Sequence, residues 1–118
     1  MLAAGAVDCL QADVTRALGI TGVLKVVALC DARGIDLSLH CAPQISGQVG
    51  TAVWHLRHLE YFHDHVRIEG LAFDGTIDPE PDGLLRPDRS AGARVDGQTR
   101  RSGGLSGRVT SRRAGRRA

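Results

Sequence analysis

Residues 34–40, GIDLSLH, predict a buried β-strand that ends in a histidine. Apolar residues alternate at Ile35, Leu37 and Leu39, and the run lies between Gly34 and the sequence CAP at 41–43. A histidine at the C-terminal end of a buried parallel strand lies where catalytic groups often act. The same position also suits a hydrogen-bonded structural histidine, so the neighbouring elements must decide between the two readings.

The chain on either side of this strand shows an alternation of strands and helices. Before this strand we expect the end of a helix, a turn at Gly5, a strand over 9–14 and a helix over 22–33. After it we expect a helix over 46–56 and a strand over 58–62. Thr21 and Ser46 are the predicted helix N-caps, and Gly34 ends the first of these helices. This order is typical of parallel βαβ units, so the sequence predicts an α/β fold.

That topology predicts that three chemically reactive side chains lie close together. Right-handed crossovers place the C-terminal ends of the three strands at one sheet edge, where Asp13, His40 and Glu60 become neighbours. An imidazole between two acids suits proton transfer, because a carboxylate holds the ring in one tautomer and raises its basicity.

Length and composition limit the alternatives. The 118 residues, 42% of them hydrophobic, suffice for one modest domain. The sequence contains no run of 18 apolar residues that would predict a membrane span, and its N-terminus does not read as a secretory signal. Cys9, Cys30 and Cys41 are odd in number and lack C-x-x-C spacing, which predicts free thiols in a reducing, cytoplasmic setting.

Charge divides the chain into two parts. Residues 1–90 carry 7 Lys and Arg against 12 Asp and Glu, whereas residues 91–118 carry 8 Arg against the single Asp96. The second part is rich in Arg, Gly and Ser without a hydrophobic period, so we expect a disordered basic tail. Such a tail can bind nucleic acid through phosphates, form a solvated extension without function, or be an out-of-frame translation of a GC-rich gene.

Four histidines, at 55, 58, 63 and 65, raise the question of a zinc site with Asp64 or Cys41. Their spacing matches none of the usual zinc patterns. We interpret them as polar residues at helix and strand ends.

Three separated blocks of sequence, in order and at the right spacing, resemble a known family. They include the runs DVTRALGITGVLKVVALCDARGIDLSLHCAP (13–43) and HLRHLEYFHDHVRIE (55–69), which are similar to the C-terminal part of the barrel domain in the enolase superfamily. The likeness is greatest to the mandelate racemase and sugar-acid dehydratase group, and it extends over residues 1–90. Leu18 stands where this family usually has a glycine.

The resemblance implies a role for each of the three residues. His40 would remove or deliver a proton on the carbon next to a substrate carboxylate, and Asp13 would orient the imidazole. Glu60 would hydrogen-bond the substrate carboxylate as it becomes an enolate-like dianion, and must be protonated when it does so. The family's cofactor is Mg²⁺, whose three carboxylate ligands lie on earlier barrel strands that this sequence does not contain.

The sequence therefore predicts a fragment of an enzyme. We expect residues 1–90 to form about three β/α units, the C-terminal part of a TIM-type (β/α) barrel, and residues 91–118 to form the tail. The intact enzyme would racemise or dehydrate a hydroxy or sugar acid as a homo-oligomer, and the isolated chain would be inactive. A rival hypothesis is a small nucleic-acid-binding module that acts through its arginines, although few aromatic residues accompany them.

Overall fold

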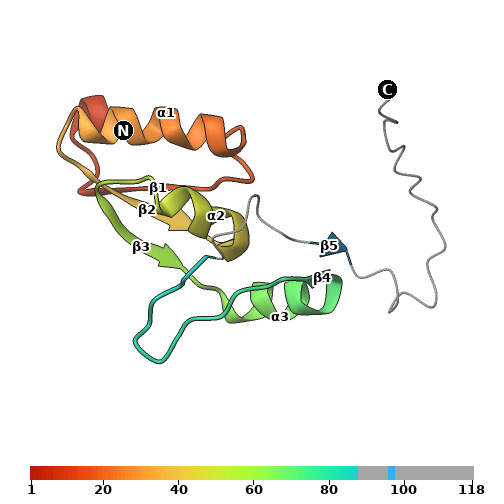
Figure 1. Ribbon diagram of the computed structural model, residues 1–118. Helices are drawn as coiled ribbons and strands as arrows, with labels where there is room; N and C mark the ends of the chain where they lie inside the picture. Colours follow the sequence, from red (N-terminus) through yellow and green to blue (C-terminus); the bar gives the residue numbers. More distant parts are fainter. Residues whose placement is uncertain (88–95, 98–118) are drawn as a thin grey trace, which may run out of the picture.

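The centre of the molecule is a three-stranded parallel sheet. The computed structural model describes residues 1–87 and 96–97 (Figure 1). Its sheet has the order β1-β2-β3, made of β1 (Cys9–Ala12), β2 (Asp36–His40) and β3 (Leu56–Glu60). Because α1 (Gly19–Asp31) and α2 (Pro43–Gly50) connect these strands, each connection is a βαβ crossover. The predicted α/β fold with a parallel sheet is confirmed.

The remaining elements are short. A 3-10 helix, η1 (Leu2–Ala4), precedes the sheet and ends at Gly5 in the left-handed conformation, with a φ of 58°. The helix α3 (His63–Ala72) follows β3, and the two-residue strands β4 (Phe73–Asp74) and β5 (Asp96–Gly97) pair in antiparallel orientation. The sequence did not predict α3, whose exposed Ile68 and Leu71 leave it without a buried face.

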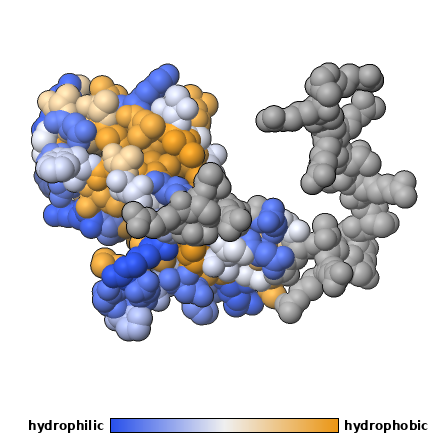
Figure 2. All heavy atoms as spheres, viewed as in Figure 1, coloured by the Kyte–Doolittle hydropathy of each residue, from blue (hydrophilic) through white to orange (hydrophobic). Residues whose placement is uncertain are grey.

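One hydrophobic core joins the sheet to α1 and α2. Leu37 and Leu39 of β2 are almost completely buried, and they pack in a cluster with Val23 and Val27 of α1 and Val49 of α2. Burial of each large aliphatic side chain contributes about 1.5–3 kcal/mol. Figure 2 shows hydrophobic residues gathered over this part of the molecule, whereas the loop of residues 75–83 is mostly hydrophilic.

The alternation of side chains along β2 determines which of them point away from the core. Successive side chains of a strand point to opposite faces, so Ser38 and His40 lie on the face opposite Leu37 and Leu39. A one-residue register shift at Arg57 then pairs His58 with Ser38 and Glu60 with His40. Without the shift Glu60 would lie on the other face, because a slip of one residue reverses every side chain.

The predicted strand limits are close to the observed ones. The first strand ends at Ala12 rather than Val14, and the third covers 56–60 rather than 58–62. Asp13 therefore follows its strand directly, while Glu60 is the last residue of its own strand.

The predicted start of the first helix is wrong. The helix α1 begins at Gly19, and its N-cap is Leu18 in a left-handed conformation with a φ of 61°, without a side-chain hydrogen bond. Thr21 lies inside the helix instead of capping it. The helix ends at Asp31, and Gly34, with a φ of 63°, makes the turn into β2.

The predicted limits of the second helix are also wrong. The helix α2 covers Pro43–Gly50 instead of 46–56, because Pro43 supplies the fixed φ that favours a first helical turn. Ser46 is a buried residue inside the helix. After Gly50 the chain forms a turn, in which Ala52 N donates a hydrogen bond to Val49 O and Val53 N donates one to Gly50 O. The helix therefore ends early enough for β3 to begin at Leu56.

Polar contacts join the segment after α3 to the residue that follows β3 and link residues within the segment. The Tyr61 hydroxyl donates a hydrogen bond to Asp78 at 2.6 Å, and burial together with this bond raises the pKa of Tyr61 to about 12. Arg86 pairs with Asp82 at 2.7 Å and with Glu80. The Tyr61 contact thus ties the segment to the end of β3, and the Arg86 pairs close its loop.

The predicted basic tail lies outside the described residues except for Asp96–Gly97, which form β5. Within residues 1–87 and 96–97, no helix is long and apolar enough to cross a bilayer.

Gly22 lies where a side chain cannot be accommodated. A Cβ atom at this position would stand 1.6 Å from the Ala17 carbonyl oxygen. We expect Gly22→Ala to lower the free energy of unfolding of the full chain by about 2–3 kcal/mol, measured by urea denaturation. Gly70→Ala is the matched control, since its Cβ would meet nothing within 4 Å and alanine favours the helix by up to about 1 kcal/mol. Equal stability of the two variants would contradict this account.

Leu18 carries backbone strain. Its side chain is 90% exposed, so it contributes little packing to offset the left-handed φ. Relief of about 1–2 kcal/mol of strain exceeds the entropic cost of glycine, so Leu18→Gly should raise the stability by up to about 1 kcal/mol. Leu18→Ala, which keeps the strain, should leave the urea midpoint nearly unchanged. A glycine variant less stable than the alanine variant would refute this explanation.

Candidate active site

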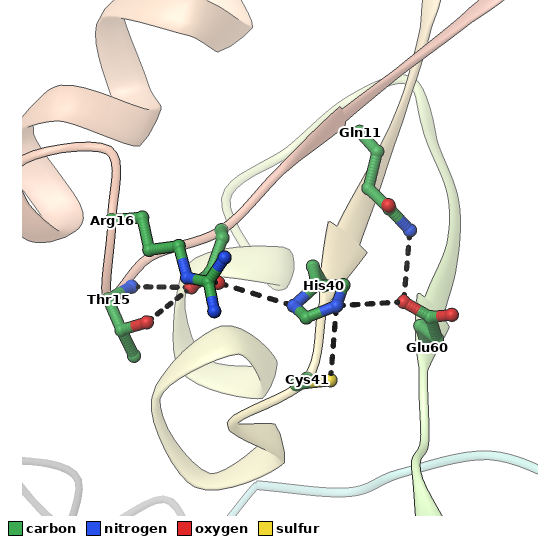
Figure 3. A network of polar contacts seen from close by, with 7 residues as sticks. Gln11, Thr15, Arg16, His40, Cys41 and Glu60 are labelled. Atoms are coloured by element: carbon green, nitrogen blue, oxygen red, sulfur yellow. Dashed lines mark hydrogen bonds and ion pairs between the residues drawn. The ribbon is translucent and has the colours of Figure 1, made fainter.

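His40 lies between two carboxylates at the C-terminal edge of the sheet (Figure 3). Its Nδ1 is 3.2 Å from Oδ2 of Asp13, and its Nε2 is 3.5 Å from Oε2 of Glu60. The side chains of Asp13, His40 and Glu60 are 15%, 28% and 32% exposed. The site is therefore partly shielded from water but open to a small molecule.

Asp13 is fixed by the turn that follows β1. Both the backbone N–H and the hydroxyl of Thr15 donate hydrogen bonds to Oδ1 of Asp13, at 2.8 and 2.6 Å. Arg16 Nε lies 3.3 Å from Oδ2, the same oxygen that faces His40. The carboxylate is thus oriented before any ligand binds.

These contacts favour the ionised form of Asp13. Burial by itself would raise the pKa of Asp13, but the two hydrogen bonds from Thr15 and the charges of His40 and Arg16 hold that pKa below its ordinary value. Asp13 is therefore a carboxylate at neutral pH.

Glu60 is oriented by a residue of β1. The side-chain amide of Gln11 donates a hydrogen bond to Oε2 of Glu60 at 3.1 Å, across the face of β2 (Figure 3). The same oxygen faces Nε2 of His40. Gln11 thereby fixes the end of the Glu60 side chain.

Cys41 brings a thiol to the same place. Its Sγ is 3.5 Å from Nε2 of His40, within hydrogen-bonding distance for sulfur. Burial, followed by the charges of Glu60 and Asp13, raises the pKa of the Cys41 thiol, so the thiol keeps its proton. The thiol group then donates to Nε2.

The neighbours of His40 determine which of its ring nitrogens carries the proton. Nδ1 faces the Asp13 carboxylate, which favours the tautomer with hydrogen on Nδ1. Nε2 then carries the lone pair. The Nδ1 contact is an ion-pair approach rather than an aligned hydrogen bond.

An open cavity of about 270 Å³ adjoins the imidazole. It is lined by Gln11, Asp13, Arg16 and His40. A carboxylate, two hydrogen-bonding side chains and a guanidinium around one cavity suit a small polar ligand with its own negative charge.

The predicted convergence of Asp13, His40 and Glu60 is confirmed by these distances. Their catalytic roles stay predictions. Sequence reasoning missed Gln11 and Cys41 as members of the site. Gln11 precedes Asp13 by two residues, and the strand period could have identified it; no sequence signal indicates the position of the Cys41 thiol.

The histidines of 55–65 do not form a metal site in the part of the chain that the structure describes. His63 is 91% exposed and lies 3.8 Å from Asp64. His58 lies in the middle of β3 rather than at an element end.

The fold and the site define a class of protein. A parallel sheet with crossover helices that carries an acid, an imidazole and a second acid at its C-terminal edge is typical of α/β enzyme domains. Residues 1–96 match the profile of the family described as Enolase C-terminal domain-like. The chain belongs to this family, within the enolase superfamily.

A solved structure supports the same conclusion. The chain is 54% identical to a mandelate racemase/muconate lactonizing enzyme-like protein from Rubrobacter xylanophilus, with a TM-score of 0.74. The match covers 80% of this chain and 26% of that protein, so the chain spans about a quarter of its relative. No curated protein sequence matches the chain. The comparisons give no support to a nucleic-acid-binding module.

Removal of the Thr15 hydroxyl tests the electrostatics of Asp13. Thr15→Val should raise the pKa of Asp13 and lower stability at pH 7 by about 1–2 kcal/mol, since a hydrogen bond to a charged group is lost. Because the folded-state pKa of Asp13 is depressed, its contribution is present above the ordinary pKa of 3.8 and disappears as pH falls through the folded value. The two proteins should therefore converge in stability at acid pH.

The measurement is urea denaturation between pH 2 and 7, together with carboxyl NMR titration. Thr51→Val is the control, because the Thr51 hydroxyl donates to the Gln48 carbonyl and touches no carboxylate. A stability difference between Thr15→Val and the parent that does not change with pH would exclude the proposed electrostatic cause.

Proposed function

We propose that this chain is the part of an enolase-superfamily enzyme that moves a proton on the carbon next to a substrate carboxylate. The observation that supports this most is the position of His40, whose Nδ1 lies at Asp13 and whose Nε2 lies beside Glu60, next to an open polar cavity. The intact enzyme would racemise or dehydrate a hydroxy or sugar acid.

In this proposal His40 is the base. Nε2 takes the α-proton, and the resulting imidazolium is stabilised by the Asp13 carboxylate 3.2 Å from Nδ1. The hydrogen bonds from Thr15 keep that carboxylate ionised and oriented during the transfer. General base catalysis of this kind contributes about 10²- to 10⁴-fold to the rate.

Glu60 and Gln11 would act on the substrate carboxylate. Glu60 would hydrogen-bond the substrate carboxylate as negative charge accumulates on its oxygens. Gln11 holds the Glu60 side chain in position from β1. Arg16, beside the same cavity, would attract the anionic substrate.

The Mg²⁺ that the family implies does not fit the described residues. Mg²⁺ prefers six oxygen ligands in octahedral geometry. The one cluster of potential metal ligands within residues 1–87 and 96–97 contains an imidazole, a thiol and a single carboxylate. Carboxylates from elsewhere in the intact enzyme would have to hold Mg²⁺, so the steps above are derived without it.

The domain organisation is part of the same proposal. Residues 1–90 would form about three β/α units of a TIM-type barrel, and β1 and β3 would pair with further strands of the intact enzyme. The chain covers 26% of its relative, which is consistent with an isolated chain that is inactive. We propose a cytoplasmic homo-oligomer for the intact enzyme.

A chimera tests the function directly. Residues 1–87 would replace the matching segment of the Rubrobacter xylanophilus protein, and exchange of the α-proton of hydroxy and sugar acids would be followed by NMR in D₂O. The chimera should exchange the proton of at least one acid. His40→Asn should slow exchange on at least one face by about 10²-fold or more, because the base is lost.

His63→Asn is the matched control, since this exposed histidine lies outside the site. Full exchange in the His40 variant would rule out His40 as the base. Absence of exchange with every acid, in a folded chimera, would count against the function itself.

A further inference from the structure

We propose that His40, Cys41 and Glu60 form a three-ligand site for a thiophilic divalent cation such as Zn²⁺. Nε2 of His40, Sγ of Cys41 and a carboxylate oxygen of Glu60 all lie within 4.8 Å of one another. This set of ligand types differs from the all-oxygen set that Mg²⁺ prefers.

Two of the three ligand separations fit tetrahedral coordination, and the third, between Cys41 and Glu60, lies within 4.8 Å. Zn–S bonds of about 2.3 Å and Zn–N or Zn–O bonds of about 2.0–2.2 Å place neighbouring ligand atoms about 3.3–3.6 Å apart. Nε2 of His40 lies 3.5 Å from Sγ of Cys41 and 3.5 Å from Oε2 of Glu60. A cation could therefore enter with small side-chain adjustments, and its binding would release the Cys41 thiol proton to solvent, because the thiolate is the ligand.

The backbone brings the thiol to this position. Successive residues of a strand normally point to opposite faces, which would separate Cys41 from His40. Cys41 instead has a φ of 46° and Ala42 a φ of 44°, so the chain turns sharply after β2 and the thiol faces the neighbouring imidazole (Figure 3). Left-handed residues other than glycine are strained, and such residues cluster at functional sites.

The surroundings complete the requirements of a metal centre. Asp13 faces Nδ1 of His40, as a carboxylate does in the carboxylate–histidine–zinc arrangement that fixes a metal-binding ring. Gln11 orients the Glu60 carboxylate in the same way. Three protein ligands leave a fourth position open for water or a small anion.

Metal binding would compete with catalysis. The cation takes the lone pair of Nε2 that the proposed base needs, so Zn²⁺ would inhibit proton transfer. This consequence rests on the proposed function, whereas binding itself does not.

Cobalt spectroscopy of the full chain tests the site. Co²⁺ should bind with one equivalent and produce a thiolate-to-cobalt charge-transfer band in the near ultraviolet, and Zn²⁺ should remove the band by displacement. Cys41→Ala should abolish the band. Glu60→Gln should keep the band but weaken Co²⁺ binding at least tenfold, because an anionic ligand is lost.

Cys9→Ala and His63→Ala are the controls, since both residues lie outside the cluster, and each should bind Co²⁺ as the parent does. Absence of the band in the parent, a band that persists in Cys41→Ala, or displacement of Co²⁺ by Mg²⁺ would overturn the proposal. The assay needs no turnover, so its failure leaves the proposed function untouched and inactivity of the chimera leaves the metal site untouched.

Discussion

The burial of Leu37 and Leu39 is the constraint on which the rest of the structure depends. Both side chains are nearly inaccessible to solvent, packed against α1 and α2. With these two residues fixed in the core, the two-residue period of β2 directs His40 to the other face of the sheet. Parallel pairing on both sides then brings one acidic residue to each side of the imidazole. The position of the reactive group is therefore a consequence of core packing.

The site combines strain with fixed charge. Leu18, Cys41 and Ala42 all have positive φ values, at the start of α1 and immediately after β2. The strain at Cys41 and Ala42 turns the chain so that a thiol and an imidazole lie side by side, whereas Leu18 brings no side chain to the site. The strain at Cys41 and Ala42 therefore shapes the site, whereas the strain at Leu18 results only from a residue that disfavours this conformation. A glycine at position 18 would adopt the same φ without that steric strain.

The two proposals involve the same imidazole nitrogen. Nε2 of His40 is the atom that would accept a proton from a substrate, and it is also the centre of the cluster with Cys41 and Glu60. A carboxylate at one nitrogen of a neutral imidazole makes the lone pair on the second nitrogen more basic. The second nitrogen is for this reason both a good base and a good metal ligand. Under the two proposals, selection between substrate and cation would depend on Cys41, which proton transfer does not use.

The alternation of apolar residues in residues 34–40 and the helical spacing between the strands determined the α/β class, the strand order and the convergence of Asp13, His40 and Glu60. These features depend on local periodicity, which the sequence carries directly. Helix starts were predicted less well, because a left-handed Leu18 and Ala42 replaced the expected side-chain caps Thr21 and Ser46. Only the tertiary structure decided the register shift at Arg57 that turns Glu60 toward His40, and the turn that places the Cys41 thiol at Nε2. Both depend on the pairing and packing of segments far apart in the sequence, which no local pattern specifies.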